Sequence, residues 1–435
     1  MAIDTGTLNA LYKVAYAKGV EDLIPKASKL ADMIPFVPSE LQNGKHYEQP
    51  VVLSAEAGFT YSLDTQSAYD LNDSIGMNMQ SAIVPGADIV LDSTVGYNQA
   101  ARASHSATSF KSVMSTKFEN MLKSSEKRLE IAMLYGQGSI GTTTAGSYSA
   151  VGATIALPIS AASWATGIWS GSENAKVQFS VVSTGFLPTG IGATAAFIIT
   201  AVNVDTRTVT FTEVVSGDAA EIATAASAAL YVHFFGSVTL AASVTAPIYA
   251  EMAGLKKIIT NTGSLFGIDA GAYDLWKGNS VSVTGQLTMA KVLSAVSRAV
   301  QRGLDSDAVC LVNPSTWADL ASNLAALRRY DGSYSMKKAS NGSKELEYVS
   351  QNGSLKIVSY NIVKEGDCFI FPEDKVMRIG ARELGLNDPT RPQDEIFFTI
   401  PGKAGVGLRA YTNQAIFLEA PAQAVYISGI VNSLA

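Results

Sequence analysis

The longest amphipathic stretch of the sequence predicts a single long helix. In ATSFKSVMSTKFENMLKSSEKRLEIAMLYG the apolar residues recur at the i, i+3, i+4 spacing of one helical stripe. They are Phe110, Val113, Met114, Phe118, Met121, Leu122, Leu129 and Met133. The helix should run from about residue 107 to residue 135, on the order of 40 Å at 1.5 Å per residue. A helix of this length would form a spine of the fold, and Gly136 and Gly138 would end it.

Short runs rich in β-branched and aromatic residues follow the helix. KVQFSVV, AAFIITAV, TVTFTEVV and ALYVHFFG are separated by Gly, Pro, Asp and Thr, which is typical of short strands joined by turns. AVNVDTRTVTF predicts a hairpin that turns at Asp205, Thr206 and Arg207. We therefore expect a small all-β domain, a barrel or a sandwich, over residues 142–250. GSIGTTTAGSYSAVGAT before it is typical of a linker.

The last part of the chain mixes helices and strands. LTMAKVLSAVSRAVQRG predicts an amphipathic helix that Gly303 ends, and AVCLV predicts a strand that is followed by the helix STWADLASNLAALRRY. In LVNPSTWADL, Asn313 suits the N-cap, Pro314 suits the first helical position, and Trp317 can pack back onto the strand. Further strands are expected in SLKIVSYNIV, CFIFPEDKVMRIG, EIFFTIPGK and GVGLRAYTNQAIFLEAPAQAVYISGIV. The pattern as a whole indicates an α+β fold.

Residues 46–101 follow neither pattern. They lack helical periodicity, are dotted with Gly and Pro, and contain seven acidic residues but no Lys or Arg. VVL, IVPGADIVL and the aromatic residues Phe59 and Tyr61 favour an extended β-ribbon, with disorder as the alternative. A long segment without a core of its own is usually functional or docked on something.

Charge changes this picture in two ways. Charged residues make up only 16% of the 435, against about 25% in an average soluble protein, which favours a surface covered by partners. The net charge of −6 argues against a nucleic-acid groove, which needs clustered bases. One basic cluster stands out, and it could be a solvated loop or a contact with an acidic partner or nucleic acid: Arg328, Arg329, Lys337, Lys338 and Lys344, interleaved with Tyr330 and Tyr334.

Candidate chemistry is sparse. GQGSIG at residues 136–141 has the spacing of a dinucleotide fingerprint, but the predicted helix precedes it instead of following it, which indicates a helix end. The three histidines are far apart in the sequence, and neither a zinc-ligand spacing nor a GxSxG nucleophile motif occurs. We therefore predict no catalytic residue, no cofactor and no metal site.

The sequence also predicts the compartment. Cys310 and Cys368 lie in apolar strand-like runs and are expected to be buried reduced thiols. The N-terminus lacks the basic and apolar regions of a signal peptide, and no apolar run reaches the roughly 18 residues of a membrane span. A soluble protein made inside a cell is expected.

The order of these predicted parts resembles that of the major capsid proteins of tailed bacteriophages, which have the Hong Kong 97-type fold. GLDSDAVCLVNPSTWADL, GDCFIFPEDKVMRIG and NQAIFLEAPAQAVYISGIV resemble the strand–helix unit and the closing strands of that family. LKKIITNTGSLFGIDAGAYDLWKGN is similar to its entry into the axial domain. The resemblance covers nearly all of the chain except 142–250, which looks like the β-rich insertion that some members carry.

The resemblance implies five segments. They are an N-terminal arm (1–45), an extended β-ribbon loop (46–101), the spine helix of a peripheral domain (102–141), an inserted β-barrel or sandwich domain (142–250), and an axial domain with the rest of the peripheral domain (251–435). A long charged helical extension of the built-in scaffold type is missing, which implies a separate scaffolding protein.

The implied function is structural. Copies of the chain would form hexamers and pentamers that close, with a portal protein, into an icosahedral shell around double-stranded DNA held without sequence specificity. The resemblance leaves open whether a minor cement protein also binds the shell, and it implies no membrane. The chain would be assembled in the host bacterial cytoplasm and end in the virion. A phage decoration or adhesion protein is the alternative, suggested by the Thr/Ser/Gly-rich middle part, and a cytoplasmic enzyme is a further one.

In such a shell the acidic loop needs a receiving surface on another subunit. Our hypothesis pairs acidic residues of the loop with basic residues of the spine helix. The acidic residues are Glu48, Glu56, Asp64, Asp70 and Asp73, and the basic residues are Lys111, Lys117, Lys123, Lys127 and Arg128. Some family members also join a lysine of this loop covalently to an asparagine of the next subunit. Because no lysine occurs between Lys45 and Lys111, we expect no such bond in this chain.

Overall fold

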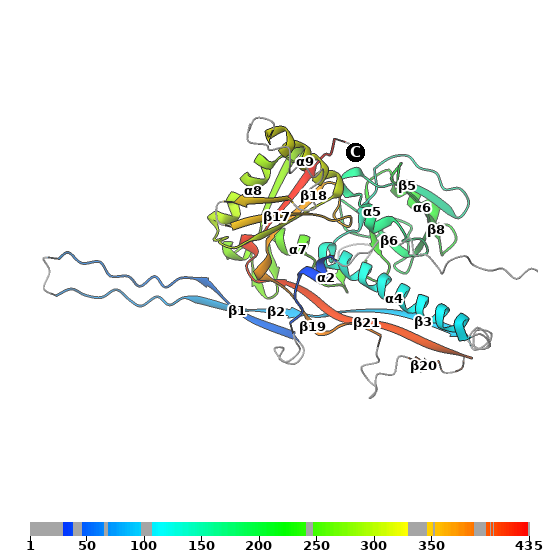
Figure 1. The fold of residues 1–435 in the computed structure, drawn as a ribbon, viewed down its shortest axis with the longest axis horizontal. Helices are drawn as coiled ribbons and strands as arrows, with labels where there is room; N and C mark the ends of the chain where they lie inside the picture. Colours follow the sequence, from blue (N-terminus) through cyan, green and yellow to red (C-terminus); the bar gives the residue numbers. More distant parts are fainter. Residues whose placement is uncertain are drawn as a thin grey trace, which may run out of the picture.

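The computed structural model describes residues 29–37, 46–64, 68–96, 107–240, 247–328, 346–350, 353–386, 397–400, 402 and 404–433. Four parts are arranged around the spine helix (Figure 1): a projecting two-stranded arm, an elongated sheet under the helix, a mixed sheet with two helices, and a small β-barrel. The N-terminal arm lies outside the described residues up to residue 28, and so does most of the basic cluster at 328–344.

The spine helix α4 (Ala107–Tyr135) has the bounds that its apolar spacing predicts. It packs on an antiparallel sheet whose strands, in sheet order, are β3 (Ala87–Gly96), β21 (Gly405–Leu418) and β19 (Val376–Gly385), with β20 (Phe397–Thr399) paired to one end of β21. Residues 129–135 of the helix are buried on every side, because the sheet, the barrel and the mixed sheet all meet there.

The predicted ribbon at 46–101 is wrong at its C-terminal end. Only β1 (His46–Ser54) and β2 (Asn78–Pro85) pair with each other, from His46 opposite Pro85 to Ser54 opposite Asn78. The following strand, β3, leaves the ribbon after Gly86 and pairs along its whole length with β21. The arm therefore spans residues 46–85, and β3 belongs to the body of the molecule.

The central strands of the mixed sheet are buried on both faces. Its order is β14 (Asn279–Gly285), β22 (Val425–Ile430), β18 (Asp367–Pro372), β15 (Ala308–Val312), β17 (Gly353–Ser359) and β16 (Leu346–Ser350). In β15, Val309 and Leu311 join the core shared with α4, whereas Val312 faces the core under α8 (Met289–Gln301). Cys310 and Cys368 are buried free thiols, as expected, with their Sγ atoms 3.4 Å apart.

The strand–helix junction in LVNPSTWADL has the predicted structural role. Helix α9 (Pro314–Arg328) begins directly after Asn313, whose Oδ1 accepts a hydrogen bond from the backbone N–H of Ser315 at 3.0 Å. Asn313 also donates from Nδ2 to the carbonyl of Val363 at 2.8 Å, and Trp317 packs half-buried against the core under α8. The N-cap is confirmed, and both polar groups of the Asn313 side chain are used in holding the junction.

Residues 141–234 form a six-stranded antiparallel sheet that closes on itself. Its order is β4 (Gly141–Thr142), β9 (Leu230–Phe234), β6 (Lys176–Val181), β7 (Phe197–Asn203), β8 (Thr208–Glu213) and β5 (Thr154–Pro158). The outer strands meet through a bridge between Thr143 and Ile159, and the N–H of Thr144 donates to the carbonyl of Pro158 at 2.9 Å. Phe179 packs edge-on against Phe197 and Phe211, with ring centroids 5.1 Å apart in both pairs. Side chains thus fill the barrel.

Two helices interrupt the all-β pattern that the sequence predicts for this part. They are α5 (Thr166–Trp169) and α6 (Asp218–Ala225). The predicted linker is also wrong at its N-terminal end, because Gly141–Thr142 is strand β4 and Thr143 closes the barrel. GQGSIG, in contrast, is the turn between α4 and the barrel, as its position after a helix predicts.

The barrel is held firmly against the rest of the chain. The backbone N–H groups of Glu365 and Gly366 donate to the carbonyls of Trp164 and Ala162 at 2.9 and 3.0 Å. Arg207 in the β7–β8 turn forms an ion pair with Glu365 at 3.0 Å. The apolar interior of the barrel is also continuous with the core around α4. The middle of the chain is therefore docked on the body and does not hang from a linker.

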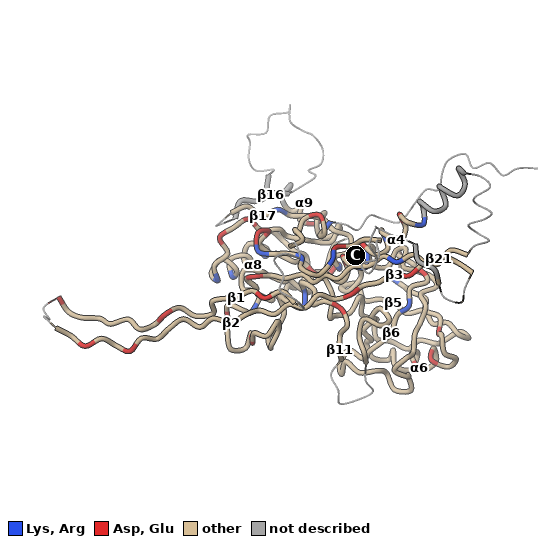
Figure 2. The backbone as a smooth tube through the Cα atoms, turned by 90° about the horizontal axis from the view of Figure 1, so that it is seen from below, with Lys and Arg blue, Asp and Glu red and all other residues tan. Residues whose placement is uncertain are grey.

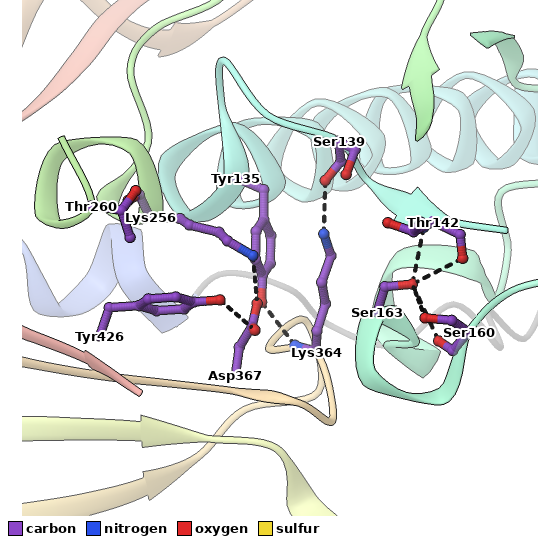
Figure 3. A network of polar contacts seen from close by, with 10 residues as sticks. All are labelled: Tyr135, Ser139, Thr142, Ser160, Ser163, Lys256, Thr260, Lys364, Asp367 and Tyr426. Atoms are coloured by element: carbon purple, nitrogen blue, oxygen red, sulfur yellow. Dashed lines mark hydrogen bonds and ion pairs between the residues drawn. The ribbon is translucent and has the colours of Figure 1, made fainter. Parts of the chain in front are cut away.

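A polar network fills the junction between α4, the barrel and the mixed sheet (Figure 3). Lys364 donates from Nζ to the carbonyl of Ser139 at 2.7 Å, and its amine lies 4.0 Å from the ring centroid of Tyr135. Asp367 accepts from Tyr426 at 2.7 Å and pairs with Lys256 at 3.3 Å. Burial and, to a smaller extent, the nearby charge of Lys256 lower the pKa of Lys364 to about 7, against the opposing effect of Asp367. The network joins three parts of the chain.

His233 in the same junction makes the fold sensitive to acid. Its Nδ1 lies 3.0 Å from the carbonyl of Gly138 and its Nε2 3.0 Å from Oγ of Ser180, so the neutral ring can donate to one and accept from the other. Burial lowers the pKa of His233 to about 4, below its ordinary value of 6.5. Between these two values the unfolded chain binds more protons than the folded chain. The stabilisation is therefore complete above pH 6.5 and is lost as the pH falls to 4.

We expect His233→Gln, which does not titrate, to remove this dependence. The difference in free energy of unfolding between wild type and variant should shrink by about 3 kcal/mol between pH 7 and pH 4. Urea unfolding of both proteins at the two pH values measures it. A difference that stays constant with pH would show that His233 is not the titrating group.

Candidate assembly interface

The arm is a two-stranded ribbon that leaves the body without a covering layer (Figure 1). Beyond β1 and β2 the two segments of the arm stay paired. The N–H of Ala57 donates to the carbonyl of Ile75 at 3.1 Å, and Asn72 donates from Nδ2 to the carbonyl of Phe59 at 2.8 Å. An isolated two-stranded ribbon is marginally stable in water. This arm therefore needs a surface to lie on.

Large apolar side chains line the outer part of the arm. Tyr61 is 90% exposed, Leu71 78% and Phe59 67%. Other exposed apolar residues of the arm are Val52, Leu63, Tyr69, Ile75, Met77, Met79 and Ile83. So many exposed large apolar side chains on one segment are typical of a site of association in a soluble protein.

The root of the arm, in contrast, is fixed in the core. Leu53, Ala82 and Val84 are buried, and Tyr47 packs against Phe417 with ring centroids 5.9 Å apart. The N–H of Ile83 also donates to the carbonyl of Phe266 at 2.9 Å. The direction of the arm is thus set by the body of the molecule, while its outer part makes no contact with the core.

The charge of the arm is one-sided. Figure 2 shows acidic residues along it, and the described residues 46–64 and 68–85 include no Lys or Arg. All five predicted contact acids lie here: Glu48, Glu56, Asp64, Asp70 and Asp73. Glu48 is paired with His46 at 3.0 Å within the arm. The arm therefore presents negative charge together with apolar groups.

Two of the predicted basic contact residues on the spine helix are bound within their own chain. Lys127 is buried and donates from Nζ to the carbonyl of Ser170 and to Oγ of Ser172, at 2.7 and 3.0 Å. Arg128 lies over the ring of Phe234, 3.1 Å from its centroid. Both side chains hold the barrel to the helix, so they are engaged within their own chain.

Two other basic residues lie nearer the surface. Lys117 is half-buried and donates from Nζ to the carbonyl of Thr94 at 2.6 Å, and Lys123 is also half-buried. The side chain of Lys111 lies outside the described side chains. The coloured N-terminal part of α4 and the outer part of the arm are at opposite ends of the molecule (Figure 1), so a contact between them has to join two copies.

The N-terminal segment is attached to the spine helix by a residue that the sequence analysis missed. Glu130 accepts hydrogen bonds from the N–H groups of Leu30 and Ala31, in α2 (Lys29–Met33), at 3.0 and 2.8 Å, and from the hydroxyl of Tyr360 at 2.6 Å. Burial outweighs the lowering effect of these hydrogen bonds, and the pKa of Glu130 is raised to about 7. An acid inside the apolar run LEIAML was the signal in the sequence.

The helices of the described residues include none that is long and apolar enough to cross a membrane. Nor do three or more His, Cys, Asp or Glu side chains gather in a metal-binding group within those residues.

Comparison with known proteins identifies the fold. No protein-family model and no curated sequence matches the chain. The structure is similar to the capsid asymmetric unit of cyanophage A-1(L), with a TM-score of 0.53 and 11% identity over 98% of this chain and 99% of that one. Mycobacterium phage Adephagia (TM-score 0.47, 11% identity, 100% and 99% covered) and the native GTA particle capsid (0.46, 9%, 97% and 96%) score lower. The assignment rests on the cyanophage protein: the chain has the α+β fold of Hong Kong 97-type capsid proteins.

Proposed function

We propose that this chain is the major capsid protein of a tailed bacteriophage, a structural subunit and not an enzyme. One observation carries the proposal: a capsid-type fold extends an apolar, acidic arm that only a second molecule can cover. Hexamers and pentamers of the chain would close into an icosahedral shell around double-stranded DNA, bound without sequence specificity.

In this proposal each arm lies on the neighbouring subunit. Its apolar residues would be buried there, and its acids would face Lys117, Lys123 and Lys111 of the neighbour's spine helix. Lys127 and Arg128 are not part of this proposed contact, because their side chains already bind the barrel of their own chain. The barrel at 141–234 would be an insertion into the shell fold, which its closed hydrogen bonding supports.

The remaining partners follow from the same proposal. A scaffolding protein would direct assembly and a portal protein would occupy one vertex. The shell would form in the host bacterial cytoplasm and end in the virion.

Electron microscopy tests the proposed function. The chain should be expressed alone and together with the neighbouring phage genes, and both samples examined in negative stain. Shells, tubes or hexameric rings are expected. A uniform small oligomer in both samples would contradict the proposal and favour a decoration or adhesion protein.

We further expect a shell without covalent links from the arm. The arm offers no lysine amine, since none occurs between Lys45 and Lys111. Mature particles boiled in detergent should give only the monomer band on a denaturing gel. The same particles treated with glutaraldehyde supply the ladder for comparison, and a ladder in the untreated sample would refute the expectation.

A further inference from the structure

A polar cavity of about 550 Å³ lies beside the C-terminal end of α8. Its wall combines the end of α7 (Leu255–Ile259), the segment that leads into β14, and the last turn of α8. Three basic side chains line it: Lys277, Arg298 and Arg302. Among the described residues, no Asp or Glu belongs to this wall.

The cationic groups come from two different elements. Arg298 and Arg302 are four residues apart at the end of α8, and Lys277 comes from the segment facing them. The guanidinium of Arg302 is held in place, because it donates to the carbonyl of Lys277 and to Asp274, both at 3.1 Å. Asp274 is largely exposed and offsets the charge of Arg302 alone. Within the described chain, neither Lys277 nor Arg298 forms an ion pair.

Helix stability explains only part of this arrangement. Bases in the last turn of a helix interact favourably with its dipole, which accounts for Arg298 and Arg302. It does not account for Lys277, which comes from another element and adds a like charge to the same cavity. Like charges that share a cavity repel each other, and an anion between them would remove the repulsion.

The chemistry of the wall selects the kind of anion. Arginine presents a planar fork of N–H donors that matches a phosphate group, and lysine supplies a compact charge. The hydroxyls of Thr262 and Ser280 and the amide of Gln301 offer further donors on the same wall. The volume lies within the range of about 300–1,000 Å³ that is usual for small-molecule sites.

We propose that this cavity binds a phosphate-bearing anion with two or more negative charges. Both a free compound, such as pyrophosphate, and the backbone of a nucleic acid carry this chemistry. Binding is a property of one chain, so it can be measured on unassembled subunits, whether or not these form a shell.

Isothermal titration calorimetry tests the proposal on the full chain at low ionic strength. Inorganic pyrophosphate and a short DNA duplex are titrated in separate experiments. The test variant is Lys277→Ala with Arg298→Ala. The control is Lys176→Ala with Lys257→Ala, which removes the same charge from exposed positions outside this cavity. Thermal unfolding without ligand checks that both double variants are folded. If the cavity variant is not folded, Arg298→Ala alone, at an exposed position, replaces it in the test.

One pyrophosphate should bind per chain to the wild type and to the control. Its affinity for the cavity variant should be at least about tenfold lower. Duplex binding that shows the same dependence, with no pyrophosphate bound, would support the site and identify the nucleic-acid backbone as its source. No binding of either ligand, or equal binding by all three proteins, would overturn the proposal.

Discussion

Replacing Phe59, Leu63 and Leu71 by serine should abolish assembly and leave the subunit folded. All three side chains are exposed on the arm and contribute nothing to the core of their own chain. Burying a large apolar side chain is worth about 1.5–3 kcal/mol, so three of them account for roughly 4–9 kcal/mol at each contact. Even after the entropic costs of association, the contact should weaken at least about a thousandfold.

Sedimentation velocity measures this loss as a shift from large particles to free subunits or capsomers. A matched control replaces Val151, Val214 and Val215 by serine, because these residues are also exposed but lie on the barrel. The control should assemble like wild type, and circular dichroism should show equal thermal stability for all three proteins. Normal assembly of the arm variant would mean that the arm does not carry the contact.

Reversing charge on either side of the proposed contact should also block assembly. Asp70→Lys with Asp73→Lys places positive charge on the arm, and Lys117→Glu with Lys123→Glu places negative charge on the helix. A single exposed ion pair contributes only about 0.2–1 kcal/mol, but like charges facing each other across an interface cost several kcal/mol. Each double variant should therefore stay as unassembled subunits at physiological salt.

Combining the two double variants restores opposite charges, and assembly should return. Salt at about 1 M, which shortens the Debye length to about 3 Å, should partly restore each double variant alone. Particle yield by light scattering reports both effects, with Lys176→Glu and Lys257→Glu as the charge-matched control. A combined variant as defective as its parents would show that these acids and lysines do not meet.

The sequence predicts the local elements well because their signals are local. The spine helix follows from one apolar stripe, and the cap of α9 follows from Asn313 and Pro314. The strand β3 could not be assigned to the body, because its partner β21 lies more than 300 residues further along the chain. The same limit applies to the barrel, in which strand β4 pairs with the distant strand β9, with Gly141 opposite Val232.

The sequence predicts only those features of the candidate interface that have a local signal. The absence of lysine and arginine marks the arm directly in the sequence. The burial of Lys127 and Arg128 depends on which element covers that face of the helix, and helical periodicity does not contain this information. Glu130 illustrates the opposite case, because an acid within an apolar run has to find partners, although the sequence does not say which.

Electron cryomicroscopy of assembled particles tests the central claim most directly. The account predicts an icosahedral shell in which the arm of each subunit lies on a neighbouring subunit. Phe59, Tyr61 and Leu71 should be covered there, and Asp70 and Asp73 should lie close to Lys117 and Lys123 of that neighbour. A shell whose arms project into solvent, or fold back onto their own subunits, would contradict it.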